Sequence, residues 1–244
     1  MVVPDKELIL KIHYELVEMF ANEEDPIEPS GLRAGGEGLL EMAVSRPHTS
    51  LGGIEKYGTY DMKVASLFHS LIHNHPFNNG NKRTALVSLL ATLDMYDRRI
   101  EISDDEVFDF VIAVAGHQSP FDNRDSDIVV EEIARWIRRN SVSRVRVPSG
   151  MKLSEFLDKC KLTGCLVRDN GGKWVIINPQ SQRSIRIRKI THTLAGQVVK
   201  QYVNRLGLSE AKTGLYLDEF LEGKIIEQQY IIRYRNVLKR LAHA

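Results

Sequence analysis

The sequence has few cysteines and no long apolar run. Only Cys160 and Cys165 occur among the 244 residues, so no disulfide framework is expected, and two small thiols inside a domain are a simpler interpretation than a metal site. No apolar stretch reaches the roughly 20 residues that span a bilayer. Residues 1–10 also lack the apolar segment of a signal peptide. We therefore expect a cytoplasmic protein that makes no membrane contact.

The net charge of +1 hides a strong asymmetry. Residues 1–140 hold 14 Lys and Arg against 24 Asp and Glu, a balance of −10, and residues 141–244 hold 19 against 8, a balance of +11. Such a division predicts two domains with different partners. The basic half is the candidate for nucleic-acid binding. Docking of that half on the acidic half, or on an acidic protein, is an equal alternative.

Hydrophobic periodicity predicts that residues 1–140 form a nearly all-helical domain of about six helices. Turn-forming residues fill 22–36, and 45–60 contains three glycines and a proline, which is typical of an irregular segment or a hairpin flap. Residues 98–102 are expected to be extended, and Ser103 is expected to cap the helix that follows. The expected helices cover residues 5–21, 37–44, 61–74, 84–95, 104–115 and 127–139.

The pattern changes after a stretch rich in Ser, Pro and Gly at 141–150, which we take as a linker. A helix at 152–161 is followed by strands at 165–167 and 173–178 around an Asn-Gly-Gly turn, and by a basic strand at 183–190. Helices are expected at 193–206, 209–222 and 225–241. The expected fold is multidomain α and α+β: a helical domain at 1–140, the linker, a small α-β-β-β-α module at 151–208 and a C-terminal helical extension at 209–244.

One polar loop, His75-Pro76-Phe77-Asn78-Asn79-Gly80-Asn81-Lys82-Arg83, joins two apolar helices. A helix that begins after such a loop exposes free backbone N–H groups at the positive end of its dipole. Lys82 and Arg83 add full charges there, which favours an anion. His75 is a group that can take up a proton near neutral pH. The residues therefore predict a phosphate-binding loop with a general base, and a capped helix corner is the alternative.

This loop resembles the motif of the Fic/Doc superfamily, and within it the death-on-curing (Doc) branch. The matching positions are His75, Phe77, Asn79, Gly80, Asn81, Lys82 and Arg83. Further matches at Gly31-Leu32-Arg33 and Leu39-Leu40-Glu41 extend the resemblance over about residues 5–140. The resemblance implies an all-helical domain that binds ATP and modifies a hydroxyl group of another protein.

The resemblance also implies roles for the loop residues. His75 would be the general base, Phe77 would anchor the loop, and residues 51–60 would form the flap that aligns the target. Asn79 stands at the position of the family's metal ligand, where an amide oxygen is a weaker Mg²⁺ ligand than a carboxylate. The implied catalytic residues are His75, Lys82 and Arg83, and the implied ATP-binding residues are Asn78, Asn79, Gly80, Asn81, Lys82 and Arg83.

Lys82 bears on the reaction. The adenylylating branch of the superfamily carries Gly at this position and a second Arg where this chain has Leu86. The resemblance therefore implies a toxin that transfers the γ-phosphate of ATP to Ser or Thr of a cytosolic protein, with a translation factor as target and a cognate antitoxin as partner. Adenylylation by the same loop is one alternative. Another is a non-enzymatic regulator that senses a nucleotide and binds nucleic acid or an antitoxin through residues 141–244.

Residues 151–208 resemble the HicA toxin family, whose small fold is similar to double-stranded RNA-binding domains. The family's catalytic His is missing from the aligned stretch Gly171-Gly172-Lys173-Trp174, so ribonuclease activity by that route is not expected. What we expect is a basic sheet face that contacts a nucleic-acid backbone. The residues placed on or near that face are Lys173, Arg186, Arg188 and Lys189, together with one aromatic side chain.

Overall fold

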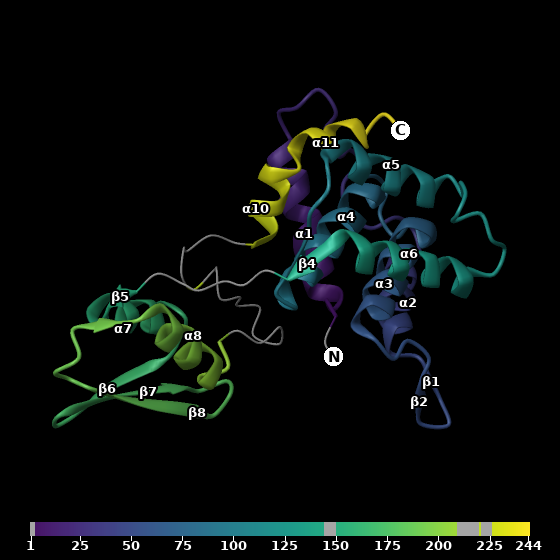
Figure 1. Cartoon of the computed structure of the whole chain (residues 1–244). Coiled ribbons are helices and arrows are strands. Elements are labelled where there is room, and N and C mark those ends of the chain that lie inside the picture. The colour runs from purple at the N-terminus through teal and green to yellow at the C-terminus, as the bar shows by residue number, and fades with distance from the viewer. Residues whose placement is uncertain (1–2, 144–149, 209–219, 221–225) are drawn as a thin grey trace. The chain divides into compact units, whose positions relative to one another are not determined.

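The structure, a computed structural model, describes residues 3–143, 150–208, 220 and 226–244. The chain separates into two compact units, residues 1–144 with 227–244 and residues 145–226 (Figure 1). Residues 227–244, expected as part of a separate extension, therefore pack with the first unit. No described helix is both long and apolar enough to cross a bilayer.

The first unit is built around two helices that are buried over most of their length. In α3 (Tyr60–Asn74) and α4 (Asn81–Met95), residues 63–72 and 83–94 are buried, which requires neighbours on several sides. The surrounding helices are α1 (Lys6–Phe20), α2 (Gly36–Ser45), α5 (Asp104–Ala115) and α6 (Ser126–Asn140). α3 packs against α2, α4 and α6, and α1 packs against α4. The helical first domain predicted from periodicity is confirmed.

Polar caps fix where several of these helices begin. The side chains of Asp5, Thr59 and Asp125 each accept a backbone N–H from the first turn of the following helix. Ser103 and Glu106 form a reciprocal capping box at the start of α5. The Ser103 cap read from the sequence is therefore present in the structure.

Short strands complete the first unit. A 3₁₀ turn (Arg46–His48) leads into a hairpin of β1 (Ser50–Leu51) and β2 (Ile54–Glu55). β3 (Arg98–Ile100) pairs in antiparallel fashion with β4 (Ser141–Ser143). The first three residues of the expected linker thus belong to a sheet of the first unit, and residues 144–149 lie outside the described part of the chain.

The C-terminal helices cover part of the first unit. The expected single helix is divided into α10 (Ile226–Arg233) and α11 (Arg235–Arg240). The Tyr230 hydroxyl donates to Asp94 Oδ1 at 2.7 Å, in α4, and Arg240 pairs with Asp105 at 2.6 Å, in α5. In Figure 1 these helices lie beside α1 and α5. The expected helix at 209–222 falls outside the described residues, apart from Phe220.

The second unit has the expected α-β-β-β-α order. The strands of its antiparallel sheet follow the order β6 (Leu166–Asn170), β7 (Lys173–Asn178) and β8 (Arg183–Arg188). Two helices, α7 (Leu153–Leu162) and α8 (Gly196–Arg205), share one apolar core with this sheet. The core includes Phe156, Ile176 and Val199. β9 (Thr193–Leu194) pairs with β5 (Met151–Lys152). The expectation that a helix begins at residue 193 is therefore wrong. The helix begins at Gly196, because the backbone of Thr193–Leu194 pairs with β5, a strand that the periodicity of the sequence does not indicate.

Candidate functional site

The polar loop connects α3 to α4 and encloses a hollow of about 190 Å³. His75 ends α3 in the left-handed conformation (φ 48°). Gly80 precedes α4 with φ 76°, and a Cβ there would lie 3.0 Å from Ile27 Cγ2, so this position requires glycine. All the predicted site residues line the hollow, together with two residues of the C-terminal turn: His75, Asn78, Asn79, Gly80, Asn81, Lys82, Arg83, Leu241 and Ala242.

The loop is pinned to the segment before α2 by backbone contacts. Leu32 and Phe77 form an isolated antiparallel bridge, and the Arg33 N–H donates to the Pro76 carbonyl at 3.1 Å. A Cβ on Gly36 would meet the Pro76 oxygen at 2.2 Å, so only glycine permits this approach. The Gly31-Leu32-Arg33 match of the sequence is thus explained by backbone pairing.

His13 supports the loop from beneath, a role that is not evident from the sequence. Its ring stacks on Phe77 at 3.9 Å between centroids. Its Nε2 accepts the Gly31 N–H at 3.1 Å, and its Nδ1 lies 3.1 Å from Thr84 Oγ1. Burial, helped by the nearby Arg83 charge, lowers the pKa of His13 to about 4. The ring is therefore neutral near pH 7. The sequence offers one indication of this role, which is that His13 lies on the otherwise apolar face of the first helix.

Two asparagine side chains shape the loop through its own backbone. Asn81 Oδ1 accepts the Phe77 N–H at 3.0 Å, and Asn81 Nδ2 donates to the Phe77 carbonyl at 2.9 Å. Asn79 Oδ1 accepts the Gly80 N–H at 2.6 Å, and its Nδ2 donates to the Glu28 carbonyl at 3.0 Å. These bonds hold the loop in one conformation before any ligand binds.

Two cations lie in the first turn of α4. Lys82 Nζ donates to the Ala244 carbonyl at 2.6 Å. Arg83 is 2% exposed, donates from Nη1 to the Asp25 carbonyl at 3.1 Å and lies over the Phe20 ring at 5.5 Å. Among the described residues, neither cation forms an ion pair with a carboxylate side chain. Both residues line the hollow, so their charges make its potential positive.

His75 is the one histidine among the described residues that line the hollow, and much of its side chain is exposed. Partial burial, together with the positive charges of Arg33 and Lys82, lowers its pKa below the ordinary value. The imidazole is consequently neutral at physiological pH and can accept a proton.

The hollow does not fit a protein-held Mg²⁺. None of the described residues that line it carries a carboxylate, whereas Mg²⁺ sites use one or two carboxylates together with substrate phosphates. The Asn79 oxygen, the expected ligand, already accepts the Gly80 N–H. In the described part of the chain, no group of three His, Cys, Asp or Glu side chains could hold a metal. Lys82 and Arg83 are the Lys and Arg residues among the described residues that line the hollow.

The turn after α11 narrows the hollow. Leu241 and Ala242 contribute to its wall, and His243 Nε2 lies 2.6 Å from Asp25 Oδ2. A volume of about 190 Å³ is below the roughly 300–1,000 Å³ that is usual for small-molecule sites. The hollow is therefore smaller than a usual small-molecule site.

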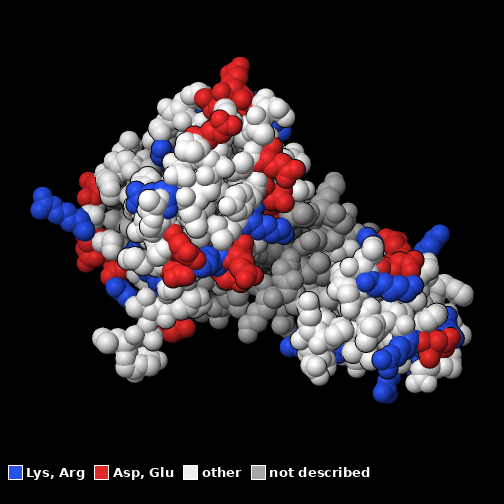
Figure 2. All heavy atoms as spheres, turned by 180° about the vertical axis from the view of Figure 1, so that it is seen from behind, with Lys and Arg blue, Asp and Glu red and all other residues white. Residues whose placement is uncertain are grey.

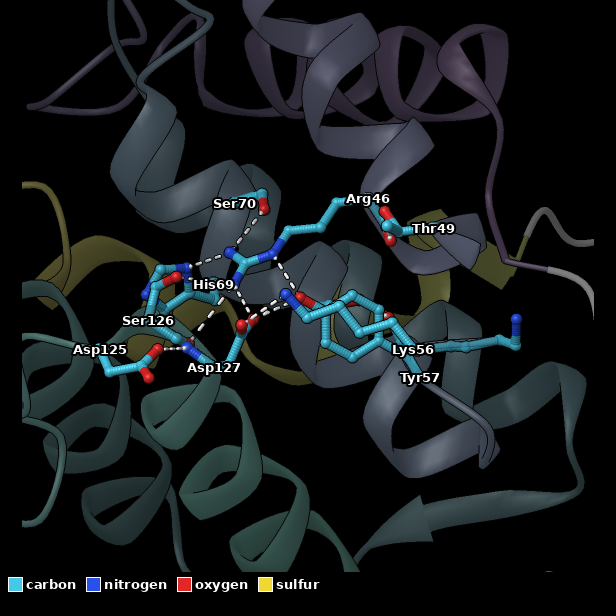
Figure 3. Close-up of polar contacts among 11 residues, drawn as sticks. Arg46, Thr49, Lys56, Tyr57, His69, Ser70, Asp125, Ser126 and Asp127 are labelled. Carbon is cyan, nitrogen blue, oxygen red and sulfur yellow. Dashed lines mark hydrogen bonds and ion pairs between the residues drawn. The ribbon is translucent and has the colours of Figure 1, made fainter. Parts of the chain in front are cut away.

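A second polar network, centred on Arg46, holds the base of the flap (Figure 3). Arg46 donates from Nε to the Tyr57 hydroxyl at 2.9 Å, lies with Nη1 3.0 Å from His69 Nδ1, and pairs through Nη2 with Asp127 Oδ1 at 3.2 Å. Asp127 also accepts the Tyr57 hydroxyl at 2.7 Å and pairs with Lys56 at 2.5 Å. Although burial acts to raise it, hydrogen bonds from Lys56, Tyr57 and Arg46 lower the pKa of Asp127 to about 2.

The tip of the flap is apolar and exposed. Leu51 and Ile54 face each other across the hairpin and are 87% and 77% exposed. At the base, the buried Lys63 ammonium donates to the Pro47 carbonyl and to Glu55 Oε1, both at 3.0 Å. The hairpin foreseen at 51–60 therefore has a fixed base and a free apolar tip.

Comparison with known proteins agrees with the geometry of the first unit. Residues 4–93 match the Fic/DOC family and form a domain of that family. Toxin Doc of Mycolicibacterium smegmatis is 38% identical over 72 residues, which cover 27% of this chain and 55% of that protein. The chain thus spans about half the length of this relative. No solved structure matches the chain. These matches do not support a relationship between residues 151–208 and the HicA family.

Proposed function

We propose that the chain is a Doc-like toxin that uses ATP to phosphorylate a Ser or Thr hydroxyl of another protein. The observation that carries this proposal is that a neutral histidine and two cations line one hollow at the start of α4, and that neither cation pairs with a carboxylate side chain of the described residues. The Fic/DOC domain at residues 4–93 and the similarity to the relative named Toxin Doc also support this proposal.

ATP phosphates would bind at the N-terminus of α4. Gly80 provides no side-chain cap there, so the first N–H groups of the helix point toward the hollow without an internal partner. The positive end of the helix dipole and the charges of Lys82 and Arg83 add to that potential. The bonds of Asn81 and Asn79 to the loop backbone mean that little reorganisation is required on binding.

The transfer step follows from the residues that line the hollow. Neutral His75 takes the proton of the target hydroxyl while the hydroxyl oxygen forms a bond to the γ-phosphorus. The bond from the γ-phosphorus to the β-γ bridging oxygen breaks, and ADP leaves with that electron pair. Phosphoryl transfer depends chiefly on positioning and on neutralisation of the phosphate charge. Lys82 and Arg83 supply that charge from the protein.

The flap and the C-terminal turn define the two approaches to the site in this proposal. The exposed tip residues Leu51 and Ile54 would hold the segment of the target that carries the hydroxyl, by pairing with the hairpin edge. ATP would enter after displacement of the turn at Leu241–Ala242. We propose a translation factor as the target and a cognate antitoxin as the partner that restrains the toxin.

Labelled ATP tests the proposal. The purified chain is incubated with individual translation factors and ATP labelled at either the α- or the γ-phosphate, and the label on protein is measured. We expect transfer only from the γ position. Transfer only from the α position would identify adenylylation by the same loop instead. If neither label is transferred although the protein binds ATP and remains folded, the chain is a nucleotide-sensing regulator.

A further inference from the structure

The second unit presents one strongly basic, open face of its sheet. Residues paired across antiparallel strands point to the same side, and the pairings place nine side chains on the side opposite the helices. They are Leu166, Arg168, Asn170, Lys173, Val175, Ile177, Ser184, Arg186 and Arg188. Four of the nine are Lys or Arg and none is acidic. We call this set the basic face.

The opposite side of the same strands belongs to the core. Trp174, Ile176, Ile185 and Ile187 lie in or against the apolar cluster with α7 and α8. The expectation of an aromatic on the basic face is therefore wrong, because the register of β7 turns Trp174 toward the helices. The one acidic residue in the three strands, Asp169, is also on this inner side and pairs with Lys189 at 2.5 Å. Lys189 therefore contributes to the inner side rather than to the basic face.

The cations of the basic face act together. Arg168 and Arg186 flank Val175 on neighbouring strands, so their Cα atoms lie about 10 Å apart, and Arg186 and Arg188 are about 7 Å apart along β8. These separations are close to the Debye length of about 8 Å at physiological salt. The charges thus add to one positive field. A hollow of about 460 Å³ lies among Asn170, Lys173, Val175, Arg186, Arg188 and Ile190.

The surroundings of the face strengthen this field. Residues 151–208 hold 11 Lys and Arg against 3 Asp and Glu, a balance of +8. Figure 2 shows acidic side chains gathered over parts of the first unit, and Lys and Arg side chains projecting from the second. All four cations of the face are exposed. Among described residues, none of the four forms an ion pair with a carboxylate.

We propose that the basic face binds a double-stranded nucleic acid through its phosphate backbone. Regularly spaced cations without intervening acids match a polyanion of high charge density. The lack of an aromatic on the face disfavours single strands, whose binding sites stack bases on aromatic rings. Shape and charge would therefore decide binding, with little reading of base sequence. This inference does not depend on the transferase activity proposed for the first unit.

The test measures binding of the full-length chain to a duplex DNA, a duplex RNA and a single strand of equal length, by fluorescence anisotropy at several salt concentrations. Arg186→Gln with Arg188→Gln removes two charges from the basic face. Lys159→Gln with Lys161→Gln removes two charges from α7, on the other side of the sheet, as the matched control. If each arginine neutralises one phosphate, the log–log salt slope for DNA decreases in magnitude by about 1.8 in the first variant and is unchanged in the second.

Tighter binding of either duplex than of the single strand, lost selectively in the arginine variant, supports the proposal, and the two duplex arms identify which nucleic acid is bound. Absence of duplex binding by the wild type overturns it, as does equal weakening by both variants. Equal affinity for poly-glutamate would show that the face binds acidic protein instead. Circular dichroism of each variant verifies the fold.

Discussion

Asn81→Leu should loosen the polar loop with hardly any change in side-chain size. In the native loop, Asn81 accepts the Phe77 N–H at 3.0 Å and donates to the Phe77 carbonyl at 2.9 Å. A leucine side chain can make neither bond. Loss of a hydrogen bond costs roughly 0.5–1.5 kcal/mol, and a half-buried carbonyl left unpaired costs more. We expect the free energy of unfolding of the first unit to decrease by about 2 kcal/mol at pH 7.

The position of Asn81 in the first turn of α4 is the reason for a neutral replacement. A carboxylate there would lie at the positive end of the helix dipole beside Lys82 and Arg83, and this attraction would offset the lost hydrogen bond. Leucine carries no charge, so the change in stability reports the loss of the two hydrogen bonds.

Urea unfolding measures the effect in a Trp174→Phe background, where Trp136 in α6 is the remaining tryptophan and reports on the first unit. Asn22→Leu makes the same replacement at an exposed position and should change stability by less than about 0.5 kcal/mol. Wild-type stability of Asn81→Leu, or an equal loss of stability in both variants, would refute the assigned role of Asn81.

Three further predictions follow from the contacts of the site. Arg33→Ala removes a positive charge that lowers the pKa of His75, so the acidic limb of the transfer rate should move to higher pH, which a pH–rate profile measures; an unchanged limb would mean that another group titrates. Asp127→Asn removes the charge shared by the base of the flap, so limited proteolysis should cleave residues 50–56 faster, and an unchanged cleavage rate would contradict that anchoring. Arg240→Ala removes an ion pair and a cation–π contact that hold α11 on α5. The rate of nucleotide association, measured by stopped flow, should therefore increase, whereas the control Arg233→Ala should leave it unchanged. Equal association rates for the wild type and both variants would show that the turn after α11 does not restrict entry of the nucleotide.

Features encoded by neighbouring residues could be predicted from the sequence. The helices of the first unit follow from apolar periodicity, and the start of α5 follows from Ser103 three residues before Glu106. The candidate site could also be predicted from the sequence, because His75 and Lys82 lie in one continuous loop whose ends are fixed by two buried helices.

Features that depend on distant contacts could not be predicted. His13 packs on Phe77 from 64 positions earlier in the chain, and neither residue signals the other. The return of α10 and α11 to the first unit depends on packing contacts such as that of Tyr230 with Asp94. The placement of Trp174 depended on strand register, since a shift of one residue exchanges the two faces of a strand.

The proposed role of His75 is tested most directly by His75→Ala, with the rate of γ-phosphate transfer and the Kd for ATP measured on the same preparation. His192→Ala, at an exposed position of the second unit, is the matched control. We expect the transfer rate to decrease by about 10²–10⁴-fold, as for loss of a general base, with ATP affinity unchanged and the control fully active. Transfer at the wild-type rate by His75→Ala would contradict the assignment of the base. Loss of ATP binding along with transfer would make His75 a binding residue instead.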